Sequence, residues 1–402
     1  MDPFYRPTYA EVSLDALQHN IAAFRHALPK EIAIMAVVKA DAYGHGAVEV
    51  AKQAMQSGAD YLAVAFLDEA LELRQAGIDA PILALGYTPP EGLEPARKQR
   101  ITVTAYSQEI MDAMERISAS AAGQPDEPKL HVHVKIDTGM GRIGLHREEE
   151  AIRYIERALS LPGIQVEGVF THYANADEED KSYTLEQHRK FMRVVRHFTE
   201  RGSAIRFFHA GNSATAIDTP ELACNMVRLG ISMYGLYPSA EVNRNTIELQ
   251  PVMSLKTGIV HLKTLPPNSG ISYGTIYYTS KDEAIATLPI GYADGFSRML
   301  TGKAEALVRG RRVPIVGRIC MDQCMANVSS VPDASMGDEV VLIGRQGAEE
   351  ISADEVAAWL GTINYEVTCM VSHRVPRVYI REGKPVRTIN PLLRHRFHTF
   401  TM

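Results

Sequence analysis

The sequence predicts an α/β fold, a (β/α)8 TIM-type barrel, followed by a C-terminal mostly-β domain. Apolar runs alternate eight times with helix-like segments over roughly the first 240 residues, and short apolar or alternating runs separated by turn residues then follow. A chain of 402 residues that is 46% hydrophobic can form two cores. We expect the barrel at residues 12–243 and the β domain at residues 244–402, with residues 1–11 packed on the β domain.

Eight apolar, β-rich runs predict the barrel strands: Ile32–Val38, Tyr61–Phe66, Pro81–Leu85, Ile101–Ala105, Leu130–Ile136, Ile164–Phe170, Ile205–Phe208 and Met226–Leu229. The segments between them are too long for hairpins, so the strands should pair in parallel. Helices are predicted at Gly46–Gln56, Asp68–Gln75, Gln108–Ser118, Glu149–Leu159 and Leu185–Arg201, with weaker ones at Pro89–Arg100 and Ser213–Pro220. A helix at Ser13–Leu28, with Ser13 as its N-cap, precedes the first strand.

The second part of the chain is typical of an all-β domain with one helix. Its strand-like runs are Met253–Leu265, Ala284–Leu288, Glu305–Val308, Val313–Ile319, Ala326–Val328 and Glu339–Ile343. The helix is predicted at Ala353–Leu360, with Ser352 as its cap. A basic tail begins at Arg381 and includes Arg394, His395, Arg396 and His398, and we interpret it as a solvated end.

Composition argues against several classes of protein. A formal net charge of −6 gives no general attraction to nucleic acid or to an anionic membrane. We see neither a secretory signal nor an apolar run of membrane-span length, and therefore expect a cytoplasmic protein. Four cysteines, Cys224, Cys320, Cys324 and Cys369, suggest reduced thiols. Cys320 and Cys324 are too few ligands for zinc, so we expect no metal and two small buried hydrophobes.

Polar residues gather where the predicted strands end, and that edge is where barrel enzymes build their active sites. Lys39 directly follows the first strand, so its amine would lie at the mouth of the barrel. Desolvation there lowers the pKa of a lysine and favours Schiff-base chemistry. A lysine that only ends a strand and reaches solvent is the alternative. Tyr43 follows the same strand, and further candidates at other strand ends are Lys135, Arg142, His172, His209, Asn212, Ser213 and Arg228.

One motif suggests a different ligand. Gly139, Gly141 and Gly144 form the G-x-G-x-x-G pattern of dinucleotide-binding folds, with Glu167 some twenty residues further on. The motif follows the fifth strand, whereas such folds carry it after their first. Arg142 also occupies the loop, where close approach to a pyrophosphate favours small residues. We therefore disfavour a dinucleotide site.

Eight motifs together resemble the alanine racemase family. They are AVVKADAYGHG (Ala36–Gly46), KIDTGMGRIG (Lys135–Gly144), HAGNSA (His209–Ala214), NMVRLGISMYGLYP (Asn225–Pro238), ISYG (Ile271–Gly274), GYADG (Gly291–Gly295), RICMDQ (Arg318–Gln323) and TINYE (Thr362–Glu366). The resemblance implies a pyridoxal 5'-phosphate enzyme, a homodimer with shared active sites, that interconverts L-alanine and D-alanine. It also implies a supply of D-alanine for peptidoglycan.

The resemblance assigns roles to individual residues. Lys39 resembles the Schiff-base lysine and one base, and Tyr273 from the partner subunit resembles the second base on the opposite face of Cα, because inversion needs a base on each face. His172, Arg228 and Asp322 would support them. Arg228 would face the pyridine nitrogen, which it leaves unprotonated because arginine keeps its own proton.

The remaining assignments concern binding. The cofactor-binding residues by similarity are Lys39, Tyr43, His172, Asn212, Ser213, Arg228, Gly230, Ile231 and Tyr365. Arg142 and the backbone of Met321 would bind the substrate carboxylate, and Tyr292 and Tyr365 would form a narrow access gate. Lys135 resembles a lysine that is carbamylated in the family, and an unmodified lysine screened by Asp137 or water is the alternative.

Three other functions are considered. A basic amino-acid decarboxylase of the same fold would place a carboxylate where Arg228 lies. A racemase of broader specificity would be expected to carry a secretory signal. A cofactor-homeostasis protein would be a lone barrel without Tyr273 and the β domain.

Overall fold

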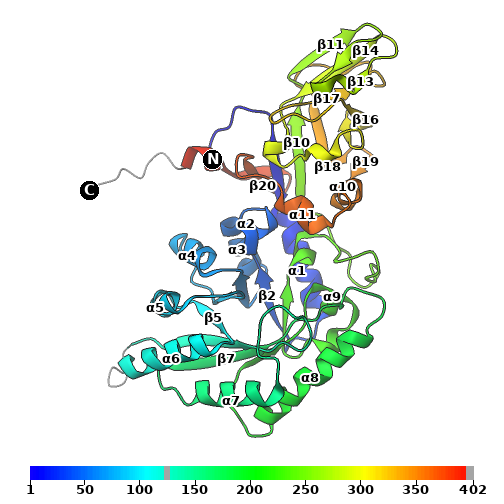
Figure 1. Ribbon diagram of the computed structural model, residues 1–402. Helices are drawn as coiled ribbons and strands as arrows, with labels where there is room; N and C mark the ends of the chain where they lie inside the picture. The colour runs from blue at the N-terminus through cyan, green and yellow to red at the C-terminus, as the bar shows by residue number, and fades with distance from the viewer. Residues whose placement is uncertain (122–126, 395–402) are drawn as a thin grey trace, which may run out of the picture. The chain divides into compact units, whose positions relative to one another are not determined.

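The structure is a computed structural model that describes residues 1–121 and 127–394. The chain divides into two compact units (Figure 1). The barrel unit consists of Leu17–Ala42 and Ala47–Gln250, and the β unit consists of Met1–Ala16, Tyr43–Gly46 and the chain from Pro251 on. The short segment Tyr43–Gly46 thus belongs to the β unit although it follows the first strand of the barrel.

The barrel unit contains the predicted parallel sheet, in the order β8-β7-β6-β5-β4-β3-β2-β9. Its strands are β2 (Ala33–Val37), β3 (Tyr61–Val64), β4 (Ile82–Ala84), β5 (Thr102–Ala105), β6 (Leu130–Lys135), β7 (Ile164–Phe170), β8 (Phe207–His209) and β9 (Met226–Leu229). All seven pairings are parallel. The predicted (β/α)8 class is therefore confirmed, as a near-barrel whose ladder is open between β8 and β9.

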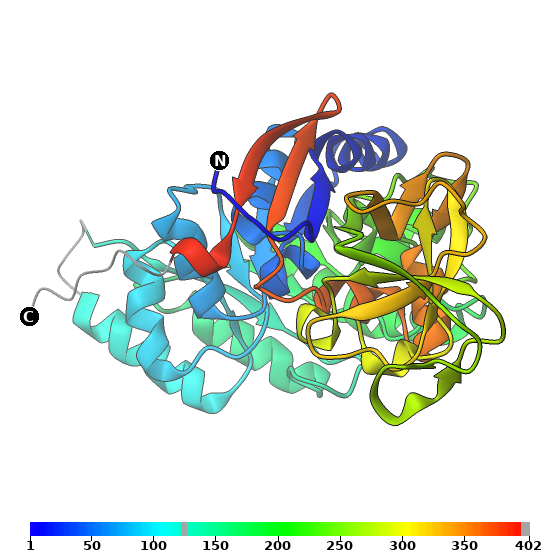
Figure 2. The ribbon, with the colours of Figure 1, turned by 90° about the horizontal axis from the view of Figure 1, so that it is seen from above.

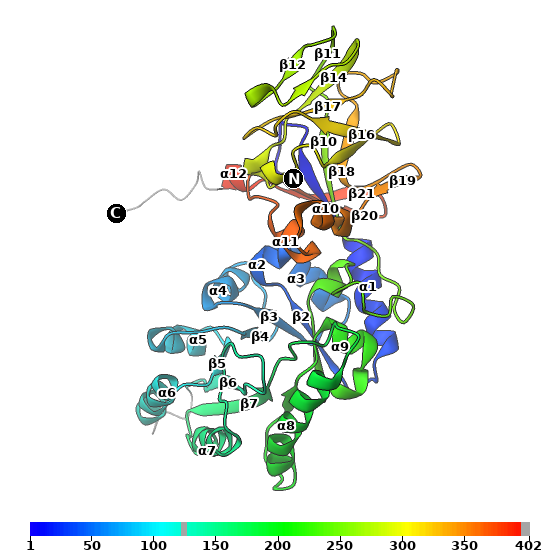
Figure 3. The same ribbon diagram turned by 45° about the vertical axis from the view of Figure 1, so that its right-hand side comes forward.

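Helices surround this sheet, and Figure 3 shows α4 to α8 outside the strands that they connect. They are α1 (Leu14–Ala27), α3 (Ala47–Gln56), α4 (Leu67–Gln75), α5 (Leu93–Lys98), α6 (Gln108–Ala121), α7 (Glu148–Leu159), α8 (Ser182–Thr199) and α9 (Ser213–Asp218). The Ser13 hydroxyl accepts from the Ala16 N–H at 3.1 Å, as its capping position predicts. Helix α8 begins earlier than predicted because the Asp180 carboxylate accepts from the backbone N–H of Ser182.

The β unit is built on a large, mostly antiparallel sheet, in the order β11-β14-β17-β16-β15-β18-β10-β1-β20-β21, with β19 beside β18. The strands are β1 (Tyr9–Ser13), β10 (Met253–Gly258), β11 (His261–Leu265), β14 (Glu283–Leu288), β15 (Glu305–Val308), β16 (Arg311–Val316), β17 (Cys324–Asn327), β18 (Glu339–Gln346), β19 (Glu349–Ile351), β20 (Arg377–Arg381) and β21 (Lys384–Ile389). A separate two-stranded sheet is formed by β12 (Gly270–Ile271) and β13 (Tyr277–Tyr278). The helices are α10 (Ala353–Leu360), α11 (Asn364–Cys369) and α12 (Pro391–Arg394).

Two expectations about this unit need correction. The predicted run Met253–Leu265 is two strands, because β10 pairs with β1 and β18 whereas β11 pairs with β14. The chain from Arg381 is not simply a solvated end: Arg381 ends β20, and β21 closes the sheet as an edge strand (Figure 2). Because lysine and proline are tolerated on such an edge, β21 has a polar composition without the apolar pattern from which strands are predicted. His395, Arg396 and His398 lie outside the described residues.

The sequence predicts reduced cysteines, no metal site and no membrane-spanning segment. None of the four cysteines forms a disulfide. Cys324 is buried as expected, whereas Cys320, which was expected to be buried as well, is only partly buried. Within residues 1–121 and 127–394, no three His, Cys, Asp or Glu side chains form a group that could hold a metal ion. No helix in those ranges is long and apolar enough to cross a membrane.

Candidate functional site

Cationic side chains of the barrel unit converge at the C-terminal ends of its strands. His172, just after β7, is the centre of this group. Burial lowers the pKa of its imidazole well below the usual range, and the positive charges of Arg228, Arg142, Lys135 and Lys39 lower it further. Four predicted site residues from β2, β6 and β9 and their following loops are therefore close to one ring. Such a concentration of positive charge suits an anionic ligand.

Arg228 is buried, with 4% of its surface exposed, and its guanidinium is held by four groups. It donates to His209 Nδ1 at 2.8 Å, to His172 Nδ1 at 3.0 Å, and to the carbonyl oxygens of Thr171 and Ala210 at 2.9 and 2.8 Å. Burial lowers its pKa to about 10, so the group stays charged at neutral pH. All four of these partners are neutral, which leaves the cation able to act on a ligand.

Lys135, the last residue of β6, is almost fully buried. Burial, and then the charge of Arg228, lowers the pKa of its amine to about 7. Its Nζ donates to the Ile136 carbonyl at 2.8 Å and lies 5.4 Å from the centre of the Phe170 ring. A large fraction of this amine is therefore neutral near neutral pH, which is the form that can react with carbon dioxide.

The glycine-rich loop after β6 is shaped by Asp137. Its carboxylate accepts from the N–H groups of Gly139 and Gly141 at 3.0 and 3.1 Å. Gly139, Gly141 and Gly144 all have positive φ, and a Cβ on Gly144 would lie 2.7 Å from the backbone nitrogen of Asp137. The three glycines are thus required by the loop itself. The loop presents Arg142, whose exposed guanidinium meets no hydrogen-bond acceptor among the described residues.

The predicted phosphate ligands meet where β8 and β9 end. Asn212 caps α9 by accepting from the Thr215 N–H at 3.1 Å, and Ser213 Oγ accepts from the Gly230 N–H at 3.0 Å. A 3-10 turn begins at Ile231, so its first N–H groups have no partner within the turn. The buried Ser232 hydroxyl of this turn has no hydrogen-bond partner among the described atoms. These donors fit a phosphate group.

Gln187 lies beside the candidate site and was not predicted from the sequence. It is fully buried on α8. Its amide donates to the His172 carbonyl at 3.0 Å and to Thr138 Oγ1 at 3.3 Å, and its oxygen accepts from the Ala174 N–H at 2.9 Å. It therefore ties the His172 loop to the Arg142 loop. The available signal was a glutamine at a helix position whose buried face is mostly apolar.

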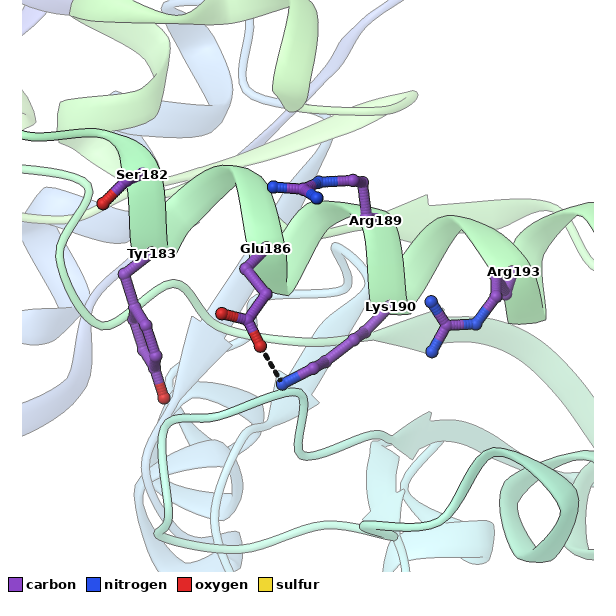
Figure 4. Close-up of a pocket in the computed structure, with 6 residues that line it drawn as sticks. All are labelled: Ser182, Tyr183, Glu186, Arg189, Lys190 and Arg193. Atoms are coloured by element: carbon purple, nitrogen blue, oxygen red, sulfur yellow. Dashed lines mark ion pairs between the residues drawn. The ribbon is translucent and has the colours of Figure 1, made fainter.

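The solvent-facing side of α8 carries charged residues, in contrast to the buried side that includes Gln187. A shallow hollow there is lined by Ser182, Tyr183, Glu186, Arg189, Lys190 and Arg193 (Figure 4). Glu186 pairs with Lys190 at 2.7 Å, and the Tyr183 hydroxyl donates to the Gly139 carbonyl at 2.8 Å. We interpret this face as a solvated surface whose tyrosine also supports the Arg142 loop.

The chain between Lys39 and Gly44 has an unusual conformation. Ala40, Asp41, Ala42 and Tyr43 follow one another with φ of 53, 52, 53 and 54°. A left-handed turn without glycine costs roughly 1–2 kcal/mol per residue, and such strain persists where the surrounding structure enforces it.

In the β unit, the buried Tyr43 ring lies 6.2 Å from the Tyr365 ring. Burial, and then Tyr365, raises the pKa of Tyr43.

The other predicted residues of the β unit lie in exposed turns. Tyr273 is 71% exposed, and the turn that carries it has positive φ at Ser272, Gly274 and Thr275. The backbone N–H of Ala293 donates to the Met321 carbonyl at 3.1 Å, which places Met321 beside the turn of Tyr292.

Asp322 is fixed from within the β unit. Its carboxylate accepts from Arg374 at 2.6 Å, and the same guanidinium binds the fully buried Asp294 at 2.7 Å. The β unit therefore presents Tyr292, Met321 and Asp322 on supported turns, while Tyr273 is a largely exposed aromatic residue.

Two family models match nearly the whole chain. The one described as alanine racemase, N-terminal domain, matches residues 12–238, and the one described as alanine racemase, C-terminal domain, matches residues 252–379. An alanine racemase from Clostridium tetani is 49% identical over 382 residues, which cover 95% of this chain and 97% of that protein. One from Methanococcus maripaludis is 48% identical, with 93% of this chain and 99% of that protein covered.

Solved structures agree with these relatives. The alanine racemase from Bacillus anthracis with bound L-Ala-P is 44% identical with a TM-score of 0.89, and the match covers 97% of this chain and 99% of that chain. A histidine racemase from Leuconostoc mesenteroides is 29% identical with a TM-score of 0.85, over 94% of this chain and 100% of that chain. The fold is thus shared by racemases named for different amino acids.

Proposed function

The chain belongs to the alanine racemase family, and we propose that it interconverts L-alanine and D-alanine with pyridoxal 5'-phosphate as its cofactor. The structural observation that carries the proposal is the buried Arg228, a cation held only by neutral partners at the ends of the barrel strands. A decarboxylase of this fold is expected to place a carboxylate at that position, and the β unit argues against a lone-barrel homeostasis protein.

The residues present fit this cofactor. Lys39 would hold it covalently and Asn212 would contact it. Its phosphate would be held by Ser213, Gly230 and Ile231, together with Tyr43 and Tyr365. Arg228 would face the pyridine nitrogen and donate a hydrogen bond to it, because arginine keeps its proton at ordinary pH. When bound, the cofactor takes up the electron pair left on Cα after the amino acid loses its α-proton.

We propose that two bases handle that proton. Lys39 acts on one face of Cα and Tyr273 on the other, because inversion requires removal and return on opposite faces. Tyr273 is 71% exposed in its own chain, which supports its delivery to the partner subunit of a homodimer. His172, fixed by Arg228, would support the tyrosine.

The substrate carboxylate would be bound by Arg142 and by the backbone of Met321, with Asp322 beside it. Carbamylation of Lys135 would supply an anion to the exposed Arg142, and the lowered pKa of Lys135 favours the neutral amine that this reaction needs. Carbon-13-labelled bicarbonate should then give a carbamate resonance that Lys135→Arg abolishes, and its absence in the unaltered enzyme would contradict carbamylation.

Small side chains should be preferred because Tyr292 and Tyr365 would narrow the access path. The histidine racemase of similar fold shows that the fold alone does not fix the substrate. Histidine should therefore be assayed beside alanine. We further propose that the enzyme works in the cytoplasm and supplies D-alanine for peptidoglycan.

The test of the activity is L-alanine incubated with the holoenzyme in deuterated water, followed by chiral chromatography with mass detection. D-alanine with one deuterium at Cα would support racemisation by exchange with solvent. Deuterium in L-alanine without D-alanine would contradict the two-base mechanism. No exchange by the loaded enzyme would contradict the proposed function.

The shared site is tested by mixing two inactive variants, Lys39→Ala and Tyr273→Phe. A mixed dimer contains one site with both native bases only if Tyr273 serves the partner subunit. Activity should therefore return on mixing, and Tyr278→Phe, which alters a tyrosine that is 58% exposed in the neighbouring strand β13, should leave activity unchanged. No return of activity in verified mixed dimers would place Tyr273 elsewhere.

A further inference from the structure

A line of buried polar side chains leads from Arg228 into the interior of the barrel. Arg228 meets His209 Nδ1 at 2.8 Å, and His209 Nε2 meets His133 Nδ1 at 2.9 Å. His133 Nε2 then lies 3.8 Å from the carboxylate of Glu167, an ion-pair rather than a hydrogen-bond distance. Both imidazoles are fully buried. None of the three side chains beyond Arg228 has a role in the proposed chemistry.

The donors and acceptors of this line can be assigned from one end. Arginine only donates, so His209 Nδ1 must present its lone pair. A neutral His209 then carries its proton on Nε2 and donates it to His133 Nδ1. His133 in turn carries its proton on Nε2. Burial, with the charge of Arg228 acting on His209, lowers the pKa of both rings, which keeps them neutral.

The far end of the line requires the same arrangement. Glu167 also accepts from the Tyr61 hydroxyl at 3.0 Å and contacts His131 Nδ1 at 3.4 Å. Although burial raises its pKa, these neighbours hold the pKa of Glu167 well below its usual range, so the side chain is an anion. An anion favours an N–H directed at it, and His133 Nε2 provides one. The Arg228 cation at one end of the line and the Glu167 anion at the other therefore favour the same tautomers of His209 and His133.

The surrounding structure is shaped for these rings. The Phe170 ring stacks on His209 with centroids 4.8 Å apart and planes 1° apart. A Cβ on Gly168 would lie 2.7 Å from the His133 ring, so glycine makes the space that this histidine occupies. The line ends beside a hollow of about 400 Å³ that includes Tyr61, Thr102 and Glu167, where strands β3 and β5 begin. It therefore crosses from one end of the strands towards the other.

We propose that His133 and Glu167 are positioning residues for Arg228, which they orient through the tautomer of His209. The proposal rests on the proposed function only in the role of Arg228 towards the cofactor ring. The tautomers themselves can be measured independently of activity, so failure of one proposal can be distinguished from failure of the other.

The first test is nitrogen-15 NMR of the holoenzyme labelled in its histidine side chains, with signals assigned from His133→Phe and His209→Asn spectra. Both rings should be neutral at pH 7 with the proton on Nε2, and neither should titrate between pH 6 and pH 8. A proton on Nδ1 of either ring, or a titration in that range, would overturn the proposal.

The second test uses variants with a matched control. His133→Phe should shift the His209 resonances and lower kcat about tenfold, while KM for alanine changes by less than about twofold, because the buried His209 N–H loses its acceptor. His131→Gln alters an imidazole on the same strand that touches the same carboxylate, and it should change neither property. Equal effects of the two variants would overturn the proposal.

Glu167→Gln covers the case in which His133→Phe does not fold. Glutamine keeps the shape of the side chain and removes its charge, so the preference for an N–H at this end of the line is lost. The Nε2 resonance of His133 should shift, with a smaller shift at His209 and a smaller loss of kcat than in His133→Phe. Unchanged resonances of both rings would show that Glu167 does not act on the line.

Discussion

Gln187→Leu removes the side chain that ties two loops of the candidate site together. Leucine matches glutamine in size, so the variant deletes hydrogen bonds with little change of volume. In the native protein the Gln187 amide donates to the His172 carbonyl and to Thr138 Oγ1, and it accepts from the Ala174 N–H. Thr138 keeps a second partner, because its hydroxyl also lies 2.8 Å from that of Thr171.

Two partly buried backbone groups therefore lose their hydrogen-bond partner. Each unsatisfied group costs about 1–3 kcal/mol, so about 3 kcal/mol is expected in total after the apolar gain of leucine. At about 2–4 °C per kcal/mol for a domain of this size, the midpoint of thermal unfolding should fall by roughly 6–12 °C. KM for alanine should rise as well, since the loops of His172 and Arg142 are no longer held together.

The assay is thermal unfolding followed by circular dichroism, with Glu186→Gln as the matched control. Glu186 is the preceding residue on the same helix and forms only an exposed pair with Lys190, worth less than about 1 kcal/mol. The control should unfold within about 2 °C of the native protein. If Gln187→Leu did the same, the three hydrogen bonds would contribute nothing measurable and the reasoning would be wrong.

Three further predictions concern stability. The pKa of the unmodified Lys135 amine is about 7 in the folded protein, below its unfolded value, so the unfolded chain binds more protons between about pH 7 and 10 and stability rises with pH there; in urea unfolding in buffer free of carbon dioxide, Lys135→Met should reduce this rise between pH 7 and 9, and an unchanged slope would refute it. Asp294→Asn should cost about 3 kcal/mol in urea unfolding because its buried carboxylate binds two arginines, whereas Asp322→Asn, at an exposed carboxylate, should cost less than about 1 kcal/mol; equal losses would contradict this. Gly44→Ala should destabilise far more than Gly77→Ala, although φ is +85° and +78°, because a Cβ at Gly44 would lie 2.2 Å from a backbone oxygen and one at Gly77 would meet nothing within 4 Å; similar melting temperatures would show that the clash is relieved.

The sequence predicted the barrel well because its signals are local. Each strand is a short apolar run beside an amphipathic helix, and a chain that repeats this unit must pair its strands in parallel. The same order places strand ends on one edge, so Lys39, Lys135, His172 and Arg228 could be expected together before any contact was known. The resemblance added their roles, and the positive charges around His172 agree with that grouping.

Long-range pairing was harder to predict. The N-terminal strand β1 pairs with β10 on one side and β20 on the other. These two strands follow β1 by more than 200 and more than 300 residues along the chain. Polar edge strands such as β21 carry no apolar pattern, because one side of an edge has no neighbour and solvent takes its place.

The sequence by itself determined the fold class, the succession of the barrel strands and the residue types at the mouth of the barrel, because these follow from local periodicity and from the direction of parallel strands. Only the tertiary structure decided how those residues are held. Gln187 and the line from Arg228 to Glu167 depend on atoms from separate strands and helices meeting within about 3–4 Å, and no spacing along the chain encodes that meeting. The physical reason is that a buried polar group needs a hydrogen-bond partner, and the packing of distant parts of the chain decides which group becomes that partner.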